Sequence, residues 1–337
     1  MEKSPVAIVY NEPVNPEGSY SEASRDILDQ VGAVEESLAT LEVPSIRIPF
    51  TRDLPSFVDK ISQETIQYAF NLCESVDENP RLVGHPAAVM DILGVSYTGS
   101  PALALAITTD KLSTKRFLRA YGIPTPRFET YDNTLFPNLK ALTFPVIIKP
   151  RFEDASIGID QESIVIDEKE LRKRLPKFHD RFGPLILEEY ISGREFNVSL
   201  FGYPSPRVMP IAEMSFDGFP RELYPIVGYR AKWDRESFEY HHMPRLFPRD
   251  LSEILERKIR RTAMDCFQHF MLRDYGRVDF RVNHSGVAYV LEINANPCIS
   301  PDAGFPAALV EAGIDYNQFV RQLLEFVQQR KGEPNSP

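Results

Sequence analysis

Hydrophobic and polar residues alternate along residues 276–297, which read GRVDFRVNHSGVAYVLEINANP. A period of two predicts half-buried strands, because successive side chains of a strand point to opposite faces. The NHSG segment in the middle is a turn signal, so the two strands are expected to form a hairpin. We expect Val282 to pair with Val287 across this turn.

One face of the predicted hairpin collects oxygen ligands. In this register Arg277 lies opposite Glu292. Asp279, which lies opposite Val290, and Asn294 continue the same face. Two carboxylates and an amide oxygen are hard ligands, and they suit Mg²⁺ together with substrate phosphates and water. The hairpin alone leaves an alternative open, an exposed polar face with a cross-strand arginine–glutamate pair.

Strand and helix patterns alternate along the first 105 residues. We expect strands at 6–10, 45–48, 69–72 and 95–98, and helices at 21–41, 53–60, 63–68 and 85–93. This alternation predicts a parallel sheet with helices on its faces. A further helix is expected over residues 108–121, and it begins at Thr108 or Thr109.

The rest of the chain mixes strands and helices. A second sheet is expected from 145–149, 158–165, 185–189 and 195–200, and helices at 252–272, 305–312 and 316–330. The predicted fold class is α/β, with α+β parts. We expect an N-terminal parallel α/β domain at 1–105, a central subdomain at 106–200, a C-terminal subdomain at 201–330 and a disordered tail at 331–337.

Composition and charge restrict the class of protein. The 337 residues are 43% hydrophobic and 26% charged, which is typical of a soluble globular protein. The net charge of −10 argues against nucleic acid or an anionic membrane as the main partner, because phosphates select basic surfaces. Cys73, Cys266 and Cys298 form no close pair, so neither a disulfide framework nor a zinc site is expected. Without a signal-peptide pattern or a membrane-length apolar run, we expect a cytoplasmic protein.

Two common nucleotide-binding motifs are missing from the sequence. No glycine is followed by lysine, so the GxxxxGK[ST] motif of P-loop proteins cannot occur. No two glycines lie two positions apart, and this excludes GxGxxG as well. Both absences argue against a P-loop kinase and a standard Rossmann dehydrogenase.

Two lysines are placed to meet phosphates. Lys149 ends the apolar strand PVIIK, where a lysine can reach a phosphate as a point charge. The loop RFEDASIG that follows, residues 151–158, contains small residues and could offer backbone N–H groups to a triphosphate. Lys111 lies near the start of a predicted helix, and its alternative role is that of an ordinary solvated helix lysine.

A third segment, LILEEYISGREFNV at residues 185–198, starts as an apolar strand and continues into polar residues. Its backbone at Glu188, Glu189, Tyr190 and Ile191 could line an adenine pocket, with Glu195 close to the ribose hydroxyls. The alternative is an ordinary strand with a polar end.

Taken together, these segments resemble the ATP-grasp superfamily and, within it, the D-alanine–D-alanine ligase family. The resemblance runs from about residue 84 to residue 328 and is densest in four stretches: VSYTGSPALALAITTDKLSTK, PVIIKP, LEEYISGREFNV and GRVDF…LEINANP. It implies an ATP-grasp fold, in which an N-terminal α/β domain is followed by two α+β subdomains that clasp ATP. It also implies a homodimer.

The resemblance assigns roles to individual residues. It implies that ATP phosphates are held by Lys111 and Lys149. The adenine rim is implied at Glu188, Glu189, Tyr190 and Ile191, and ribose binding at Glu195. Two Mg²⁺ ions, for which Mn²⁺ could substitute, are implied at Asp279, Glu292 and Asn294. Arg277 matches the family's oxyanion arginine, and Lys232 matches the lid lysine that reaches the γ-phosphate.

The implied reaction joins a carboxylate to an amine. ATP phosphorylates the carboxylate, and the amine attacks the resulting acyl phosphate. Mg²⁺ and lysines offset the charge on the moving phosphoryl group. Arg277 would stabilise the tetrahedral oxyanion, and a closed lid would keep water from the acyl phosphate.

Departures from the family pattern fall on the substrate and lid positions. The first loop, NEPVNPEGSYSEAS, is not rich in glycine, and Glu22 is the best candidate there to bind a substrate ammonium. Where the family latches its lid with serine and tyrosine, this chain has Ala155, followed by Ser156, and Trp233.

Further departures fall near the second substrate. There the family has Gly and then Ser-Leu, whereas this chain has Cys298 and then Ala303-Gly304. The stretch 71–82, which includes Glu74, lacks the family's histidine and glycines. We therefore expect an ATP-dependent carboxylate–amine ligase for amino-acid-like substrates other than two D-alanines. The alternatives are a D-alanine–D-alanine ligase with a rebuilt pocket and a non-catalytic ATP-binding protein.

Overall fold

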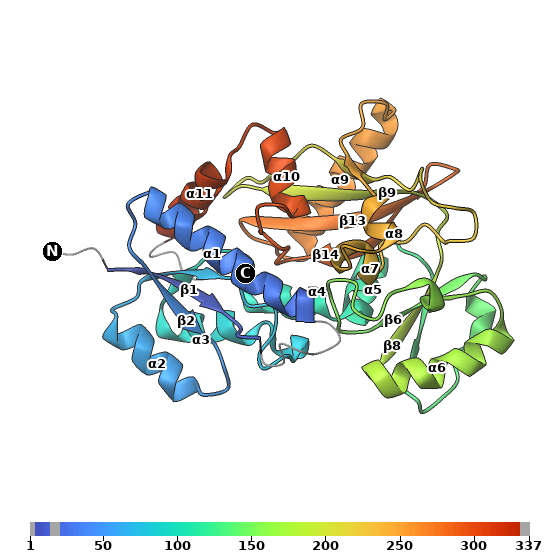
Figure 1. Ribbon diagram of the computed structural model, residues 1–337, viewed down its shortest axis with the longest axis horizontal. Coiled ribbons are helices and arrows are strands. Elements are labelled where there is room, and N and C mark those ends of the chain that lie inside the picture. The colour runs from blue at the N-terminus through green and yellow to red at the C-terminus, as the bar shows by residue number, and fades with distance from the viewer. Residues whose placement is uncertain (1–3, 14–20, 331–337) are drawn as a thin grey trace.

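The computed structural model describes residues 4–13 and 21–330 (Figure 1). The predicted tail at 331–337 and part of the first loop, residues 14–20, lie outside the described residues. No helix in the described part of the chain is long and apolar enough to cross a membrane.

The N-terminal unit contains the parallel sheet that the sequence predicts. Its strand order is β2-β1-β3-β4, formed by β1 (Val6–Tyr10), β2 (Ser45–Pro49), β3 (Tyr68–Asn71) and β4 (Ser96–Tyr97). Its helices are α1 (Ser21–Thr40), α2 (Leu54–Gln63) and α3 (His85–Leu93). The helix predicted at 63–68 is wrong, because α2 ends at Gln63 and Thr65 adopts a positive φ of 53°.

The helix predicted at 108–121 is divided in two, α4 (Ala102–Thr109) and α5 (Lys111–Ala120). Asp110 separates them, because its extended backbone stops α4 and its side chain caps α5 by accepting a hydrogen bond from the Leu112 amide at 3.1 Å. Arg151 clamps the same carboxylate with two hydrogen bonds of 2.6 and 2.7 Å. The start of α5, and with it Lys111, is thereby fixed against the loop after β6.

The central unit is an antiparallel sheet covered by one long helix. Its order is β5-β8-β6-β7, formed by β5 (Phe128–Tyr131), β6 (Val146–Pro150), β7 (Ile164–Val165) and β8 (Leu185–Glu189). The helix α6 (Glu168–Phe182) packs on it, and together they form the green lobe of Figure 1. The strand predicted at 158–165 is wrong except for β7, because Gly158 has a φ of +73° and Asp160 caps a short 3-10 turn at Gln161–Ser163.

The C-terminal unit is built on a larger antiparallel sheet in the order β12-β11-β9-β13-β14, with β10 on β9. Its strands are β9 (Gly193–Phe201), β10 (Arg207–Val208), β11 (Ala212–Met214), β12 (Arg245–Leu246), β13 (Tyr275–Asn283) and β14 (Ala288–Asn294). Its helices are α7 (Tyr229–Trp233), α8 (Phe238–His241), α9 (Glu253–His269), α10 (Gly304–Glu311) and α11 (Tyr316–Gln329). The predicted boundary at residue 200 falls inside β9, which belongs to the C-terminal sheet. The predicted division into domains at residues 105 and 200 therefore stays a proposal.

The predicted hairpin exists as β13 and β14, but its register differs. Val282 pairs with Ala288 rather than Val287, and after a register shift Asp279 pairs directly with Glu292. The shift leaves Leu291 as one extra residue in β14, a β-bulge. With this extra residue, Val290 and Ile293 both lie in the core that contains Val278 and Phe280.

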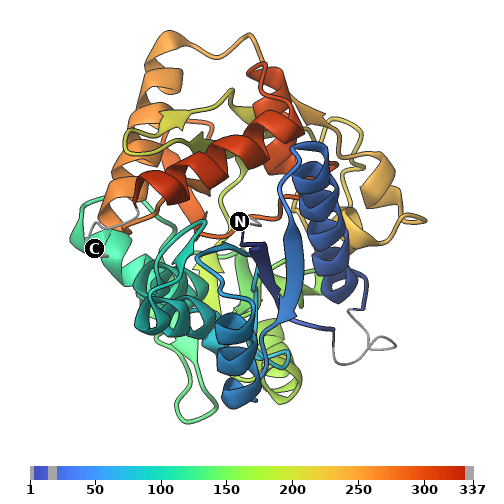
Figure 2. The same cartoon turned by 90° about the vertical axis from the view of Figure 1, so that its left-hand side faces the viewer.

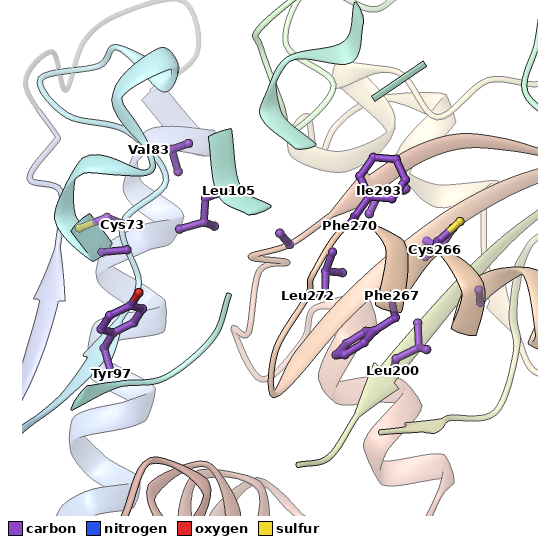
Figure 3. Close-up of a cluster of buried hydrophobic side chains, with 14 of the residues drawn as sticks. Cys73, Val83, Tyr97, Leu105, Leu200, Cys266, Phe267, Phe270, Leu272 and Ile293 are labelled. Atoms are coloured by element: carbon purple, nitrogen blue, oxygen red, sulfur yellow. The ribbon is translucent and has the colours of Figure 1, made fainter. Parts of the chain in front are cut away.

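A continuous core joins the N-terminal unit to the C-terminal sheet. Figure 3 shows Val83, Tyr97 and Leu105 on one side of this cluster and Phe267, Phe270 and Leu272 on the other. The helices α1 and α11 also lie side by side, where Ser37 donates a hydrogen bond to Asn317 at 2.7 Å (Figure 2). This packing holds one wall of the cavity described next.

Candidate active site

A cavity of about 990 Å³ lies where residues of all three units meet. Most of the residues singled out in the sequence line it: Glu74, Lys149, Ser156, Glu188, Glu189, Tyr190, Ile191, Glu195, Lys232, Trp233, Arg277, Asp279, Glu292, Asn294, Cys298, Ala303 and Gly304. Lys111 and Glu22 do not line it. Lys111 is buried behind the wall, and Glu22 accepts a hydrogen bond from the Tyr229 hydroxyl at 3.2 Å.

The polar face of the hairpin forms one wall of the cavity. Asp279 and Glu292 lie directly opposite each other, as do Arg277 and Asn294. Asp279 accepts hydrogen bonds from Arg277 Nε and Nη2 at 2.8 and 2.9 Å, and from Asn197 Nδ2 at 2.8 Å. Burial lowers the pKa of Arg277, but the Asp279 carboxylate outweighs it and raises that pKa, so the guanidinium is fixed and charged.

The donor set of this wall fits a hard divalent cation. Two carboxylates and the amide of Asn294 offer oxygen ligands on one face of the hairpin. Among the residues that the structure describes, no group of three or more His, Cys, Asp or Glu side chains is arranged to hold a metal. A metal here would therefore depend on two carboxylates, Asp279 and Glu292, supplemented by the amide, water and phosphate oxygens.

Another carboxylate, that of Asp154 in the loop after β6, lies near Glu292. Lys111 lies between this loop and the hairpin. Lys111 Nζ lies 3.4 Å from Asp154 Oδ1 and 3.6 Å from Glu292 Oε1, and it donates to the Glu153 carbonyl. Burial, reinforced by Glu292, raises the pKa of Asp154 to about 7. Burial by itself would raise the pKa of Glu292. The charges of Lys111 and Lys232 outweigh burial and hold that pKa well below the usual range. The hairpin carboxylate is thus the ionised member of the pair.

A buried charge network supports Lys149. Glu188 Oε2 lies 3.0 Å from Lys149 Nζ and 3.2 Å from Lys115 Nζ. The sequence reasoning missed Lys115, whose ammonium also donates to the Thr125 hydroxyl at 2.8 Å. The signal was its position four residues after Lys111, which places both lysines on one face of α5.

The segment after β8 lies at the predicted adenine rim. Its backbone is partly engaged, because the Glu189 amide donates to the Arg127 carbonyl and the Tyr190 amide donates to the Pro145 carbonyl, both at 2.9 Å. Glu195 forms a buried ion pair with Arg281 at 2.9 Å, and burial raises the pKa of Glu195. The sequence reasoning did not single out Arg281.

The loop 153–159 and the segment 226–233, which includes α7, meet beside the cavity. The Ser156 hydroxyl donates to the Val227 carbonyl at 2.8 Å, and the Trp233 indole donates to the Ala155 carbonyl at 2.9 Å. Ser156, which follows the departure at Ala155, and Trp233, itself a departure, therefore join these two segments directly. Between them, Lys232 lines the cavity, and burial followed by the neighbouring Arg277 lowers the pKa of Lys232.

Another part of the cavity wall carries an acidic network that ties α1 to the loop after β14. Asp26 accepts hydrogen bonds from the Cys298 thiol at 2.9 Å and the Ser300 hydroxyl at 3.0 Å. The Gln30 amide donates to Asp26 and to Glu74, each at 3.0 Å. Burial, followed by the charge of Asp26, raises the pKa of Glu74 to about 7. The sequence reasoning missed Asp26, since a lone aspartate in a helix carries no motif.

Comparison with known proteins agrees with this architecture. The structure superposes on a D-alanine–D-alanine ligase from Bacillus anthracis, crystallised with ATP, with a TM-score of 0.76 and 23% sequence identity over 98% of this chain and 99% of that one. The fold is therefore the ATP-grasp fold. The family model "D-ala D-ala ligase C-terminus" matches residues 117–325.

Sequence relatives agree with this match. The chain is 31% identical over 247 residues to a D-alanine–D-alanine ligase of Marinomonas, covering 72% of each protein. It is 30% identical over 262 residues to the uncharacterized protein y4sG of Sinorhizobium fredii, covering 77% of this chain and 74% of that protein. The chain belongs to the D-alanine–D-alanine ligase family, and it is an ADP-forming, ATP-dependent ligase.

Proposed function

We propose that this enzyme joins a carboxylate to an amine through an acyl phosphate, and that its substrates are amino-acid-like molecules other than two D-alanines. The observation that carries the chemistry is one cavity in which Asp279 and Glu292 face each other beside Arg277. Lys149 and Lys232 line the same cavity and supply positive charge.

Each group has a distinct task in this proposal. Lys149 and Lys232 hold phosphate oxygens by charge, and Lys111 acts from behind the wall through Glu292. Asp279, Glu292 and Asn294 would hold Mg²⁺, which supplies charge neutralisation at the phosphates when bound. The Asp279 clamp fixes the Arg277 guanidinium, so that it is preorganised to stabilise a tetrahedral oxyanion.

The nucleotide base would lie against the segment after β8. Glu189, Tyr190 and Ile191 line the cavity there, and the Glu189 carboxylate accepts a hydrogen bond from the Thr143 amide at 2.8 Å. In this assignment Glu195 reaches the ribose only if it shares its carboxylate with Arg281. Exclusion of water would come from the loop contacts made by Ser156 and Trp233.

The cavity wall around Cys298 and Ala303 favours substrates other than two D-alanines. Ala303 has no hydroxyl to donate to a substrate carboxylate, and the Cys298 thiol already donates a hydrogen bond to Asp26. Glu74 and Asp26 place two carboxylates in this part of the wall, and such a wall favours a substrate with a cationic or hydrogen-bond-donating group. Because curated relatives are named D-alanine–D-alanine ligase, that reaction is the second candidate.

The test is ADP release over a matrix of carboxylates and amines at saturating ATP and Mg²⁺. We expect at least one pair to give product-linked ADP well above D-alanine alone, and Lys149→Met to abolish this signal. D-alanyl-D-alanine formation as efficient as the best pair would establish the second candidate. ATP binding without ADP release for any pair, with hydroxylamine included as a general acceptor, would contradict the ligase proposal.

A further inference from the structure

Arg281, on the cavity face of β13, connects three points of the chain. Its Nη1 atom donates a hydrogen bond to the Gly193 carbonyl at 2.9 Å, and its Nη2 atom lies 2.9 Å from Glu195 Oε2. Nη2 also donates to the Pro225 carbonyl. Gly193 and Glu195 lie on β9, whereas Pro225 directly precedes the segment 226–233. One buried cation thus joins the predicted ribose carboxylate to that segment.

The buried charge of this arginine calls for a role other than stability. The side chains of Arg281 and Glu195 are 4% and 9% exposed. Removing two charges from water costs free energy that their mutual attraction often does not exceed, so an apolar pair of similar volume could stabilise the fold equally well. Both residues line the cavity. A charged pair at this position is therefore better explained by a ligand than by packing.

The Glu195 carboxylate keeps one oxygen for a ligand. Oε2 pairs with Arg281, and within the described part of the chain Oε1 accepts no hydrogen bond. Burial raises the pKa of Glu195, and the charge of Arg281 opposes this rise. The arginine therefore fixes the carboxylate and favours its ionised form, which is a strong acceptor for a hydroxyl group.

The Pro225 carbonyl anchors the start of the segment 226–233. It accepts hydrogen bonds from Arg281 and from the Tyr190 hydroxyl, the latter at 3.3 Å. Trp233, at the end of this segment, is the only tryptophan in the sequence. The position of the guanidinium therefore affects both the ribose carboxylate and the segment that carries this tryptophan.

We propose that Arg281 is a positioning residue, which orients Glu195 toward a ribose hydroxyl of the nucleotide and couples that contact to the segment 226–233. This inference rests on the proposed assignment of Glu195 to the ribose and deepens it. A ribonucleotide completes the hydrogen bonding of Glu195, whereas a deoxynucleotide leaves a carboxylate oxygen without a donor. Because an unpaired charged group withdrawn from water costs free energy, the enzyme should discriminate against deoxynucleotides.

The first experiment measures the Kd of ATP, 2′-deoxy-ATP and 3′-deoxy-ATP with Mg²⁺ by calorimetric titration of the full chain. We expect the wild type to bind at least one deoxynucleotide on the order of 10- to 100-fold more weakly than ATP, the scale of a lost hydrogen bond to a charged group. In Arg281→Met this ratio should fall to about twofold or less, because the carboxylate is no longer held in the geometry that the hydrogen bond requires. Arg281→Lys keeps the charge without the planar fork and should give an intermediate ratio.

Arg194→Met is the matched control. Arg194 precedes Glu195 on β9, but it pairs with Glu213 and does not line the cavity. This variant should keep the wild-type ratio. Because Arg281→Met leaves Glu195 buried without its cation, its thermal unfolding midpoint is measured first. Should it not fold, Arg281→Lys carries the test, and a wild-type ratio in that variant would contradict the proposal.

Tryptophan fluorescence reports on the segment 226–233 without turnover, because Trp233 is the only tryptophan. In the wild type, saturating ATP should change the emission more than the discriminated deoxynucleotide does. In Arg281→Met the two nucleotides should produce equal changes. A purely structural arginine would lower the affinity for all three nucleotides alike and leave both the Kd ratios and the fluorescence difference unchanged, and this result would overturn the proposal.

Failure of the inference can be separated from failure of the ligase proposal, because these measurements require neither a carboxylate nor an amine substrate. Discrimination that depends on Arg281 supports the inference even if no substrate pair gives ADP. ADP formation together with equal discrimination in the wild type and Arg281→Met rejects Arg281 and leaves the ligase proposal in place. Equal wild-type Kd values for all three nucleotides would reject ribose recognition by Glu195, and with it the inference.

Discussion

Replacing Glu188 with glutamine tests the buried charge network beneath Lys149. Glu188 Oε2 lies 3.0 Å from Lys149 Nζ and 3.2 Å from Lys115 Nζ, and the side chains of Glu188 and Lys115 are each 1% exposed. Glutamine keeps the shape of the side chain and removes the negative charge between the two ammonium groups. We expect the folded state to be destabilised by an amount that depends on pH.

The pKa of Lys115 determines how strongly Glu188→Gln destabilises the folded state. Burial lowers that pKa to about 8, and Glu188 opposes the shift. Without Glu188 the pKa falls further, and Lys115 is then neutral in the folded variant at pH 7. The pKa of about 8 lies one unit above pH 7, and one unit corresponds to about 1.4 kcal/mol. Because Lys115 can lose its proton in the folded variant, the destabilisation that it causes at pH 7 is limited to about 1.4 kcal/mol. Because the unfolded chain binds the proton that the folded variant lacks, the penalty grows as pH falls, towards the roughly 3–5 kcal/mol of a broken buried pair.

The assay is urea unfolding of the ligand-free protein at pH 5.5, 7.0 and 8.5. The loss of unfolding free energy in Glu188→Gln should be largest at pH 5.5 and smallest at pH 8.5. Glu129→Gln, on the neighbouring strand β5, is the matched control and should show no such trend. An equal loss of unfolding free energy in Glu188→Gln at all three pH values, or no loss at pH 5.5, would refute the proposed charge network. Adding Lys115→Met to the variant should restore much of the stability at pH 5.5.

Three further predictions concern the cavity. Lys149→Met should raise the Kd for ATP at least tenfold in calorimetric titration, whereas the exposed Lys140→Met should leave it unchanged; equal Kd values would remove Lys149 from the site. Asp279→Asn and Glu292→Gln should each raise the Mg²⁺ concentration needed for half-maximal ADP formation, and ordinary Mg²⁺ dependence in both variants would exclude the proposed ligands. Arg277→Met should keep ATP affinity, slow amide formation by roughly 10² to 10³, and still allow hydroxylamine to trap hydroxamate. Loss of ATP affinity would instead make Arg277 a phosphate-binding or structural residue.

The polar face of the hairpin could be predicted from the sequence, but its pairing could not. Alternation identified the two strands and placed Arg277, Asp279, Glu292 and Asn294 on one face, which lines the cavity. It gave the wrong partners because counting residues cannot reveal that Leu291 is extra. The turn contributes too, since the Asn283 side chain accepts hydrogen bonds from the Ser285 and Val287 amides at 3.1 and 2.9 Å. These hydrogen bonds are local in sequence, but the spacing of apolar residues alone does not predict them.

Residues without a motif were missed because only tertiary packing brings them to the cavity. Asp26 lies in α1 and Lys115 in α5, and each meets its partner from a distant segment, Cys298 and Glu188 respectively. Arg245 lies on a strand of two residues, too short for any periodic signal. Ser156 and Trp233 could be singled out from the sequence because the family pattern covers their positions. The substrate-facing residues depart from that pattern, so their roles had to come from the structure.

Transfer of oxygen from the carboxylate substrate to phosphate tests the proposed acyl-phosphate mechanism most directly. The best substrate pair from the matrix is incubated with ATP, Mg²⁺ and the full chain, with both carboxylate oxygens of the acyl donor labelled with ¹⁸O. The phosphate is then examined by mass spectrometry. Phosphorylation of the carboxylate followed by amine attack predicts ADP together with inorganic phosphate that carries one ¹⁸O atom per molecule. Unlabelled phosphate, or AMP that carries the label, would contradict the account.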